Sequence, residues 1–364
     1  MNKKEAPGKA KALGAKVEKQ LMRGCEAVAE AALRAGLDAF YGTPVAPQTE
    51  LVDYLSSRLP RGGGTFLLAP DEAAAIAMAF GGSAGGARVM TSASGPGFAR
   101  MQEGLSYLAA SELPAVVVDI GRGGPGFGNI LASQADYFSV TRGGGNGDYR
   151  TIALAPSSCQ EAADLASDAF ELAEEFRAPV VLFLDAMLAQ MMEPVTLPAR
   201  KKVAVQRKWA LTGRSERKAN VVTSTYWNSE SLDEHNYQLF GKATRIAEKV
   251  SLFEEHQCRD ADVVLVAFGI MGRVAKTAIE KARKRGLKLG LFRPISLWPF
   301  PAEKLAQAAR KARSGLVLEL STGQMLEDVK LALGDRKKVY FYGRTGGEVP
   351  SPFEVMHEAV KLLS

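Results

Sequence analysis

The chain alternates between short apolar runs and longer stretches in which apolar positions recur at helical spacing. The runs AVVVDI at 115–120 and PVVLFLD at 179–185 have the length of buried strands. By contrast, 21–36 and 159–176 are typical of alanine-rich amphipathic helices. Strands and helices that follow one another in this way predict a parallel α/β layer fold.

The pattern also divides the chain, whose 364 residues suit two or three domains. A first α/β domain is expected over 21–195. The polar, proline-containing and weakly patterned residues 196–258 are predicted to form a linker and an excursion, with a helix over 239–257. Three or four strand–helix units over 259–364, with a single strand at 287–301, predict a compact second domain. The expected fold class is therefore α/β, with two doubly wound parallel-sheet domains.

The stretch 67–129 carries most of the candidate chemistry. The acidic residue Glu72 opens an alanine-rich apolar helix, and the strand after it runs into the turn Ser94-Gly95-Pro96-Gly97. The next strand ends at Arg122, beside more glycines. Open parallel sheets bind ligands at the carboxyl ends of their strands. We therefore expect a ligand-binding edge here.

Each of these residues also has a structural interpretation. Glu72 could simply complement the dipole of its helix, and the glycine turn could be a tight connection instead of a close approach to a ligand. Arg122 suits bidentate capture of a carboxylate or phosphate, but equally a salt bridge. The phosphate loop GxxxxGK[ST] does not occur in the glycine-rich elements. The residues alone leave the reaction type open.

Charge and composition narrow the classes of protein. Of the net charge of +6, residues 1–23 contribute +5, from six Lys, one Arg and two Glu. This predicts a flexible basic arm over 1–20. Basic and aromatic residues are not interleaved there, so no nucleic-acid binding is expected. The longest apolar runs are strand-sized, and we expect neither a membrane span nor a signal peptide.

The cysteines Cys25, Cys159 and Cys258 are scattered, without CxxC spacing. They cannot by themselves hold a four-thiolate iron–sulfur cluster or a structural zinc, so no metal site is predicted on this chain. A sparse, odd set of cysteines favours a reducing cytoplasm.

Ten motifs in order resemble one family, and together they extend from Leu21 to Phe353. They include RGCEAVAEAALRAG, DEAAAIAMAFGGSAGG, TSASGPGFARMQEGLSYLAASELP, RGGPGFG, SQADYF, RPISLWPFP and FYGRTGGEVPSP. The family is that of the α subunits of thiamine-diphosphate-dependent 2-oxoacid:ferredoxin oxidoreductases, and the branched-chain (2-oxoisovalerate) type is the most similar.

The resemblance implies that the first domain is a thiamine pyrimidine-binding domain and the last a transketolase C-terminal-like domain. Glu72 matches the glutamate that hydrogen-bonds the aminopyrimidine of thiamine diphosphate and favours its reactive tautomer. The turn Ser94, Gly95, Pro96 and Gly97 would contact the cofactor. Arg122 matches the arginine that holds the substrate carboxylate.

Three departures from the family pattern bear on the substrate. Ala46, which with Pro47 would line the substrate site, replaces the usual threonine. Asn146 replaces a histidine, and Cys25 an asparagine. Loss of the threonine hydroxyl should change polar contacts with the substrate. A non-catalytic structural or regulatory subunit with a degenerate thiamine site is therefore the alternative, and another thiamine enzyme, of the transketolase or pyruvate dehydrogenase type, is a third.

The family's diphosphate-and-metal motif and its cluster-binding cysteines are missing from the sequence. The resemblance thus implies a β subunit that supplies Mg²⁺, diphosphate binding and an iron–sulfur cluster. γ and ferredoxin-like subunits, and a dimer of such heteromers, are also expected. The implied activity is oxidative decarboxylation of a 2-oxoacid to acyl-coenzyme A, with electrons passed to ferredoxin.

Overall fold

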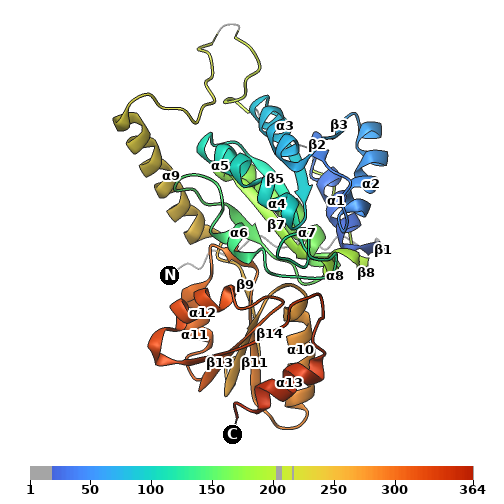
Figure 1. Cartoon of the computed structure of the whole chain (residues 1–364), viewed down its shortest axis with the longest axis vertical. Coiled ribbons are helices and arrows are strands. Elements are labelled where there is room, and N and C mark those ends of the chain that lie inside the picture. The colour runs from blue at the N-terminus through green and yellow to red at the C-terminus, as the bar shows by residue number, and fades with distance from the viewer. Residues whose placement is uncertain (1–18, 202–206, 215–216, 364) are drawn as a thin grey trace, which may run out of the picture.

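The structure, a computed structural model, describes residues 19–201, 207–214 and 217–363. Two α/β bodies lie one above the other (Figure 1). The predicted fold class is confirmed, since both bodies are built on largely parallel sheets. Most of the basic arm predicted at 1–20 lies outside the described residues. None of the described helices is long and apolar enough to cross a bilayer.

The upper body contains a seven-stranded sheet in the order β12-β6-β7-β5-β4-β2-β3. Its strands pair in parallel except β12, which is antiparallel to β6. The strands are β2 Ala39–Gly42, β3 Thr65–Leu68, β4 Val89–Ala93, β5 Ala115–Gly121, β6 Ile152–Leu154, β7 Pro179–Asp185 and β12 Ser296–Trp298. A separate antiparallel pair joins β1 Gln20–Arg23 to β8 Met192–Val195.

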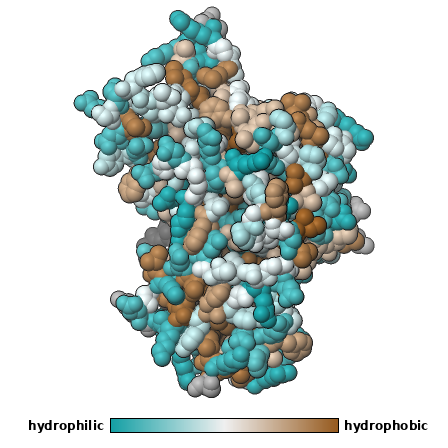
Figure 2. All heavy atoms as spheres, in the orientation of Figure 1, coloured by the Kyte–Doolittle hydropathy of each residue, from teal (hydrophilic) through white to brown (hydrophobic). Residues whose placement is uncertain are grey.

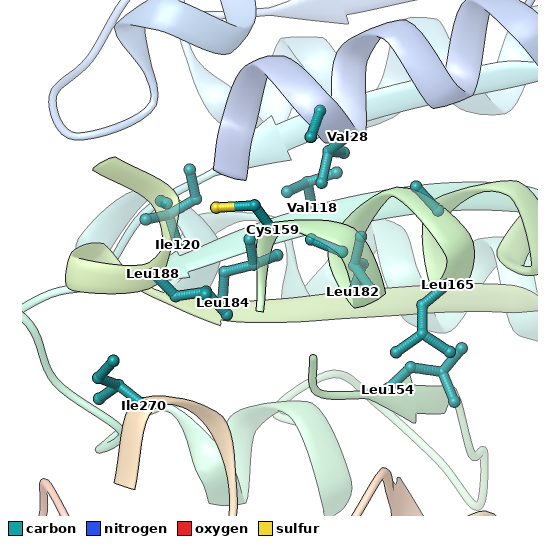
Figure 3. Close-up of a cluster of buried hydrophobic side chains, with 14 of the residues drawn as sticks. Val28, Val118, Ile120, Leu154, Cys159, Leu165, Leu182, Leu184, Leu188 and Ile270 are labelled. Atoms are coloured by element: carbon teal, nitrogen blue, oxygen red, sulfur yellow. The ribbon is translucent and has the colours of Figure 1, made fainter. Parts of the chain in front are cut away.

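Both faces of this sheet are covered, which explains the continuous apolar runs in its strands. Along β5, Val116, Val118 and Ile120 belong to one buried cluster, while Val117 belongs to another. Figure 3 shows part of the first cluster, in which Cys159 packs among side chains from helices and strands. The helices are α1 Gly24–Arg34, α2 Thr49–Arg58, α3 Glu72–Ala84, α4 Pro96–Arg100, α5 Gln102–Ala110, α6 Tyr137–Thr141, α7 Cys159–Phe176 and α8 Ala186–Gln190, with the 3₁₀ turn Pro60–Gly62.

The lower body contains a five-stranded sheet in the order β14-β13-β10-β11-β9, parallel except at β9. Its strands are β9 Phe253–His256, β10 Val263–Ala267, β11 Leu289–Pro294, β13 Ser314–Glu319 and β14 Lys338–Gly343. Its helices are α10 Gly269–Arg283, α11 Ala302–Ala308, α12 Met325–Leu333 and α13 Pro352–Val360, with the 3₁₀ turn Gly334–Arg336.

Three elements differ from the sequence prediction. The single strand expected over 287–301 is two strands, and the second, β12, joins the sheet of the upper body. The first helix begins at Gly24 instead of Leu21, because the preceding residues pair with β8. Helix α9 runs over Ser229–Lys249, about ten residues earlier than expected, since Asn228 caps its start by accepting from the Ser231 amide.

All three cysteines are buried and free. Burial raises the pKa of the thiols of Cys25, Cys159 and Cys258 to about 12. These thiols therefore remain protonated at neutral pH and act as small apolar groups of the core.

Candidate active site

Glu72 is the first residue of α3, but it is not the residue that caps the helix. Asp71 caps it, because its carboxylate accepts from the Ala74 amide at 2.8 Å. The Glu72 side chain is instead turned toward the end of β2, where the Thr43 hydroxyl donates to its Oε1 at 3.0 Å. Glu72 is only 8% exposed. Its other oxygen, Oε2, accepts no hydrogen bond from the described residues, and the exposed Arg100 guanidinium lies 3.8 Å from it.

Thr43 is itself fixed by a buried amide. The Gln48 Nε2 donates to the Thr43 carbonyl at 3.1 Å and lies 3.4 Å from its hydroxyl. Gln48 is fully buried. Sequence reasoning assigned neither residue a role, although both lie in the loop between β2 and α2. The available signal was the position of Thr43 directly after β2, because β2 pairs with β3, the strand that leads to Glu72.

The glycine turn between β4 and α4 packs against both Glu72 and Arg122. Gly95 has φ +49°, a conformation that suits glycine. A Cβ on Gly95 would lie 3.0 Å from the Cγ and Nε of Arg122. A Cβ on Gly97 would lie 2.9 Å from the Glu72 carboxyl group. The structure thus brings Glu72, Arg122 and this turn together, as the common edge of the parallel strands predicted.

Arg122 follows directly on β5, and its guanidinium reaches across to the loop after β2. Its Nη1 donates to the Ala46 carbonyl at 3.3 Å. The Ser94 hydroxyl donates to the same carbonyl, also at 3.3 Å. The peptide bond from Ala46 to Pro47 is cis. All predicted site residues from these three loops therefore meet, while Asn146 lies apart in the exposed loop after α6.

Arg122 has unused hydrogen-bonding capacity. Its Nε is buried without a hydrogen-bond partner, and among the described residues no carboxylate lies within 4 Å of its guanidinium. A structural salt bridge, the alternative interpretation from the sequence, is thus not formed in the described part of the chain. The free donors suit an anionic ligand.

Sequence reasoning missed two acids, Asp119 within β5 and Asp136 directly before α6. Burial raises the pKa of Asp119, in β5, and the neighbouring Asp136 carboxylate raises it further. Burial also raises the pKa of Asp136 to about 6, although Arg122 opposes that rise. Asp119 could have been found as the lone acid inside the apolar run AVVVDI.

An apolar cavity of about 580 Å³ continues from the Ala46 side of the site. Its apolar lining includes Ala46, Pro47, Ile130, Leu131, Met187 and Met191. The one charged side chain that lines it is Glu50, and none of the described Lys, Arg or His side chains does so. The Gln190 amide donates to Glu50 at 2.8 Å. The cavity is therefore suited to an apolar group and unfavourable for an anion.

We expect Gly97→Ala to reduce turnover at least tenfold, because the added methyl would push the Glu72 carboxylate from its position; overpacking of this kind costs roughly 1–3 kcal/mol. Steady-state kinetics of the complex implied by the family resemblance would measure this loss. Gly81→Ala is the matched control, since a Cβ at that position of α3 meets nothing within 4 Å. Equal activity of the two variants would contradict the close approach of Gly97 to Glu72.

Residues 30–255 match the family described as pyruvate flavodoxin/ferredoxin oxidoreductase, thiamine diphosphate-binding. Residues 261–355 match core domain II of pyruvate:ferredoxin oxidoreductase. The chain belongs to the pyruvate flavodoxin/ferredoxin oxidoreductase family. The family predicted from the motifs is thereby confirmed, and the members similar to this chain are subunits of oxidoreductase complexes.

Two curated members of this oxidoreductase family cover nearly the whole chain. The ketoisovalerate oxidoreductase subunit VorB of Methanothermobacter marburgensis is 45% identical over 91% of this chain and 94% of its own length. The 2-oxoglutarate synthase subunit KorA of Methanothermobacter thermautotrophicus is 32% identical, with coverage of 95% and 99%.

Solved structures agree on the fold. The 2-oxoglutarate:ferredoxin oxidoreductase of Magnetococcus marinus, with 2-oxoglutarate, coenzyme A and succinyl-CoA bound, superposes with a TM-score of 0.87 at 26% identity. It matches 95% of this chain, which spans 66% of the length of that one. A split-gene transketolase is similar in fold alone, with a TM-score of 0.58 at 14% identity over 93% of this chain and 96% of that one.

Proposed function

We propose that the chain is the α-type subunit of a 2-oxoacid:ferredoxin oxidoreductase that oxidatively decarboxylates an apolar 2-oxoacid. The acyl group would pass to coenzyme A, and two electrons would pass to ferredoxin. The observation that carries the proposal is the meeting of Glu72 and Arg122 on either side of the turn from Ser94 to Gly97. One side of the turn suits a cofactor ring and the other a substrate carboxylate.

The residues around Glu72 fit the aminopyrimidine of thiamine diphosphate. Oε1 accepts from Thr43, so Oε2 is the oxygen that would hold or move a proton at a ring nitrogen, with the exposed Arg100 guanidinium 3.8 Å away as its charged neighbour. The absence of a side chain at Gly97 leaves the carboxyl group open to a flat group. When bound, thiamine diphosphate supplies the nucleophilic carbon and the electron sink for decarboxylation.

Arg122 would orient the substrate. Its guanidinium is anchored by one nitrogen at the Ala46 carbonyl and keeps its Nε unpaired. A planar guanidinium with free donors matches the geometry of a carboxylate, and its hydrogen bonds are more directional than those of a lysine ammonium group. The Ala46 carbonyl, already bound by Ser94 and Arg122, is part of the site wall.

The cavity beside Ala46 supports a branched-chain or aromatic 2-oxoacid as the substrate. A second substrate carboxylate there would lose its hydration and meet Glu50; Arg23, which lies 3.8 Å from Glu50, does not line the cavity. An unpaired buried polar group costs about 1–3 kcal/mol. We expect kcat/KM for 2-oxoisovalerate to exceed that for 2-oxoglutarate by roughly 10–100-fold.

Steady-state kinetics with both acids would measure this preference. Glu50→Gln should narrow the ratio by admitting the second carboxylate more readily. Glu103→Gln, at an exposed carboxylate of α5, is the matched control and should leave the ratio unchanged. A higher efficiency with 2-oxoglutarate in the wild type would contradict the assignment of the cavity.

The chain is expected to work with partner subunits. Among the described residues, no group of three or more His, Cys, Asp or Glu could hold a metal ion. A β subunit is proposed to supply Mg²⁺, diphosphate contacts and the iron–sulfur cluster, with γ and ferredoxin-like subunits in a dimer of heteromers.

Exposed apolar side chains would suit contacts with these subunits. They include Leu67 and Leu68 on the edge strand β3, and Phe127 at 89% exposure. Brown apolar patches are interspersed with teal polar ones on the face in Figure 2.

The test of the proposed function is coenzyme A-dependent viologen reduction by the complex purified with its partners, supplied with a panel of 2-oxoacids. Reduction with an apolar 2-oxoacid is the expected outcome. A cytoplasmic location, where free thiols are kept reduced, is proposed as well. The alternative, a non-catalytic subunit, is motivated by the departures at Ala46 and Asn146, of which only Ala46 lies at the site. No reduction with branched-chain, aromatic or small 2-oxoacids would support that alternative.

A further inference from the structure

A buried side chain of the upper body, Gln134, occupies the carboxyl end of the lower sheet. The chain leaves β10 toward β11 and leaves β13 toward β14, so the strand connections diverge between β10 and β13. Doubly wound sheets bind ligands at such a point. Here the Gln134 Nε2 donates to the Phe268 carbonyl, just after β10, at 2.9 Å. The Leu320 amide, just after β13, donates to the Gln134 Oε1 at 3.0 Å. One glutamine amide therefore bridges the two diverging strands.

The start of α10, at the same edge of the lower body, is filled from the upper body as well. Asp185, at the end of β7, accepts from the Ile270 amide at 2.8 Å. A Cβ on Gly269 would lie 2.6 Å from the Asp185 Oδ2 and 2.7 Å from the Gln134 Nε2. Gln134 is fully buried, and Asp185 is 2% exposed. A helix start that could hold an anion thus holds a carboxylate of this chain. The edge serves as a joint between the two bodies.

Gln134 lies in the middle of the return segment, residues 129–138, which folds back on the end of β5. Arg122 forms an antiparallel bridge with Ala132. The Ser133 amide donates to the last carbonyl of β5 at 3.2 Å. The backbone position of Arg122 is therefore fixed by pairing with the residues directly before Gln134.

The lower body also holds both ends of the return segment. At its start, the Asn129 Nδ2 donates to the Gly346 carbonyl at 3.0 Å. Toward its end, the Gln324 Nε2 donates to the Ala135 carbonyl at 2.6 Å, and the Phe138 amide donates to the Gln324 Oε1 at 2.7 Å. The return segment thus pairs with the end of β5 on one side and is bound along its length by the lower body on the other.

We propose that Gln134 is a positioning residue through which the lower body holds Arg122 in the orientation that binds the substrate carboxylate. This rests on the proposed function of Arg122. The Arg122 guanidinium has a single anchoring hydrogen bond among the described residues, to the Ala46 carbonyl. Its direction therefore depends strongly on where its backbone is held. Without the Gln134 amide the return segment can shift, and the arginine shifts with it.

The test is Gln134→Met, which keeps the length of the side chain but removes both of its hydrogen bonds. We expect KM for an apolar 2-oxoacid to rise about tenfold, the size of effect that a residue outside the ligand contacts can transmit. The turnover number and the affinity for thiamine diphosphate should change little, because Glu72 keeps its own contacts. Gln134→Glu retains the acceptor for the Leu320 amide and should recover part of the loss. Steady-state kinetics of the complex assembled with its partner subunits would measure both variants.

The matched control is Arg273→Met. It removes an ion pair between α10 and Glu193 of β8, at 2.5 Å, which also joins the two bodies but involves no residue of the return segment. Its KM should stay at the wild-type value. A rise in KM in Gln134→Met that is no larger than in Arg273→Met would overturn the proposal.

A second variant keeps the test decisive if Gln134→Met fails to fold. Gln324→Ala removes two hydrogen bonds to the return segment from a partly exposed side chain. We expect KM to rise about threefold, and an unchanged KM would overturn the proposal. Failure of the proposed function has a different signature: Arg122→Ala would then leave KM unchanged, or no 2-oxoacid would be turned over. The present inference fails alone if Arg122→Ala raises KM and the two glutamine variants do not.

Discussion

Glu72→Ala is expected to lower kcat of the assembled enzyme by roughly 10²–10⁴-fold, the usual contribution of a positioned proton-transfer group. The reason lies in the geometry around α3. Glu72 is buried, Thr43 fixes one carboxylate oxygen, and Gly97 leaves the carboxyl group accessible. Alanine removes the group that would hold a proton at the cofactor ring but leaves the helix cap at Asp71 intact. The fold should therefore survive.

Single-turnover and steady-state kinetics would measure the loss, with circular dichroism to verify the fold. Glu103→Ala is the matched control, since that carboxylate is exposed on α5 and accepts from the Tyr107 hydroxyl. Thr43→Val should give an intermediate effect, because it frees Glu72 without removing it. Wild-type turnover in Glu72→Ala would refute the catalytic assignment of this glutamate.

Arg122→Ala is expected to reduce kcat/KM by roughly 10²-fold or more, mainly through KM. Removing one partner of a desolvated charge pair costs about 2–5 kcal/mol. The substrate carboxylate would lose its proposed partner, and among the described residues no other guanidinium donates to the Ala46 carbonyl. Arg122→Lys should recover only part of the loss, because an ammonium group lacks the planar fork.

Cofactor affinity separates this role from a general disruption of the site. Thiamine diphosphate should bind Arg122→Ala as it binds the wild type, which equilibrium binding of the cofactor to the complex would measure. Arg61→Ala, at an exposed residue of the turn after α2, should behave like the wild type in both assays. Loss of cofactor binding in Arg122→Ala, with unchanged KM, would contradict its proposed role.

The sequence predicted the site where the chemistry follows directly on a strand. Glu72, the glycine turn and Arg122 each lie at a strand end or a helix start, and the parallel order of the sheet brings such positions to one edge. Asp136 could not be predicted in this way. It follows an irregular segment that folds back on the end of β5 through the bridge between Arg122 and Ala132, and no periodicity encodes that path.

The same limit applies to the fold. Buried strands such as β5 and β7 were evident from their apolar runs, because both faces are covered. The sheet that β12 joins was not evident from the sequence. A proline-rich exit from β11 indicates a break in the strand. Which sheet Ser296–Trp298 joins is decided by contacts between residues far apart in the sequence.

The placement of β12 constrains how the chain can be divided. This strand forms the outer edge of the upper sheet although its residues belong to the C-terminal part of the sequence. A fragment that ends before it would leave β6 as an uncovered edge, with backbone groups available for aberrant pairing. The two bodies are thus one unit for expression and for fragment design: to make the site alone, one must also make the residues that close its sheet.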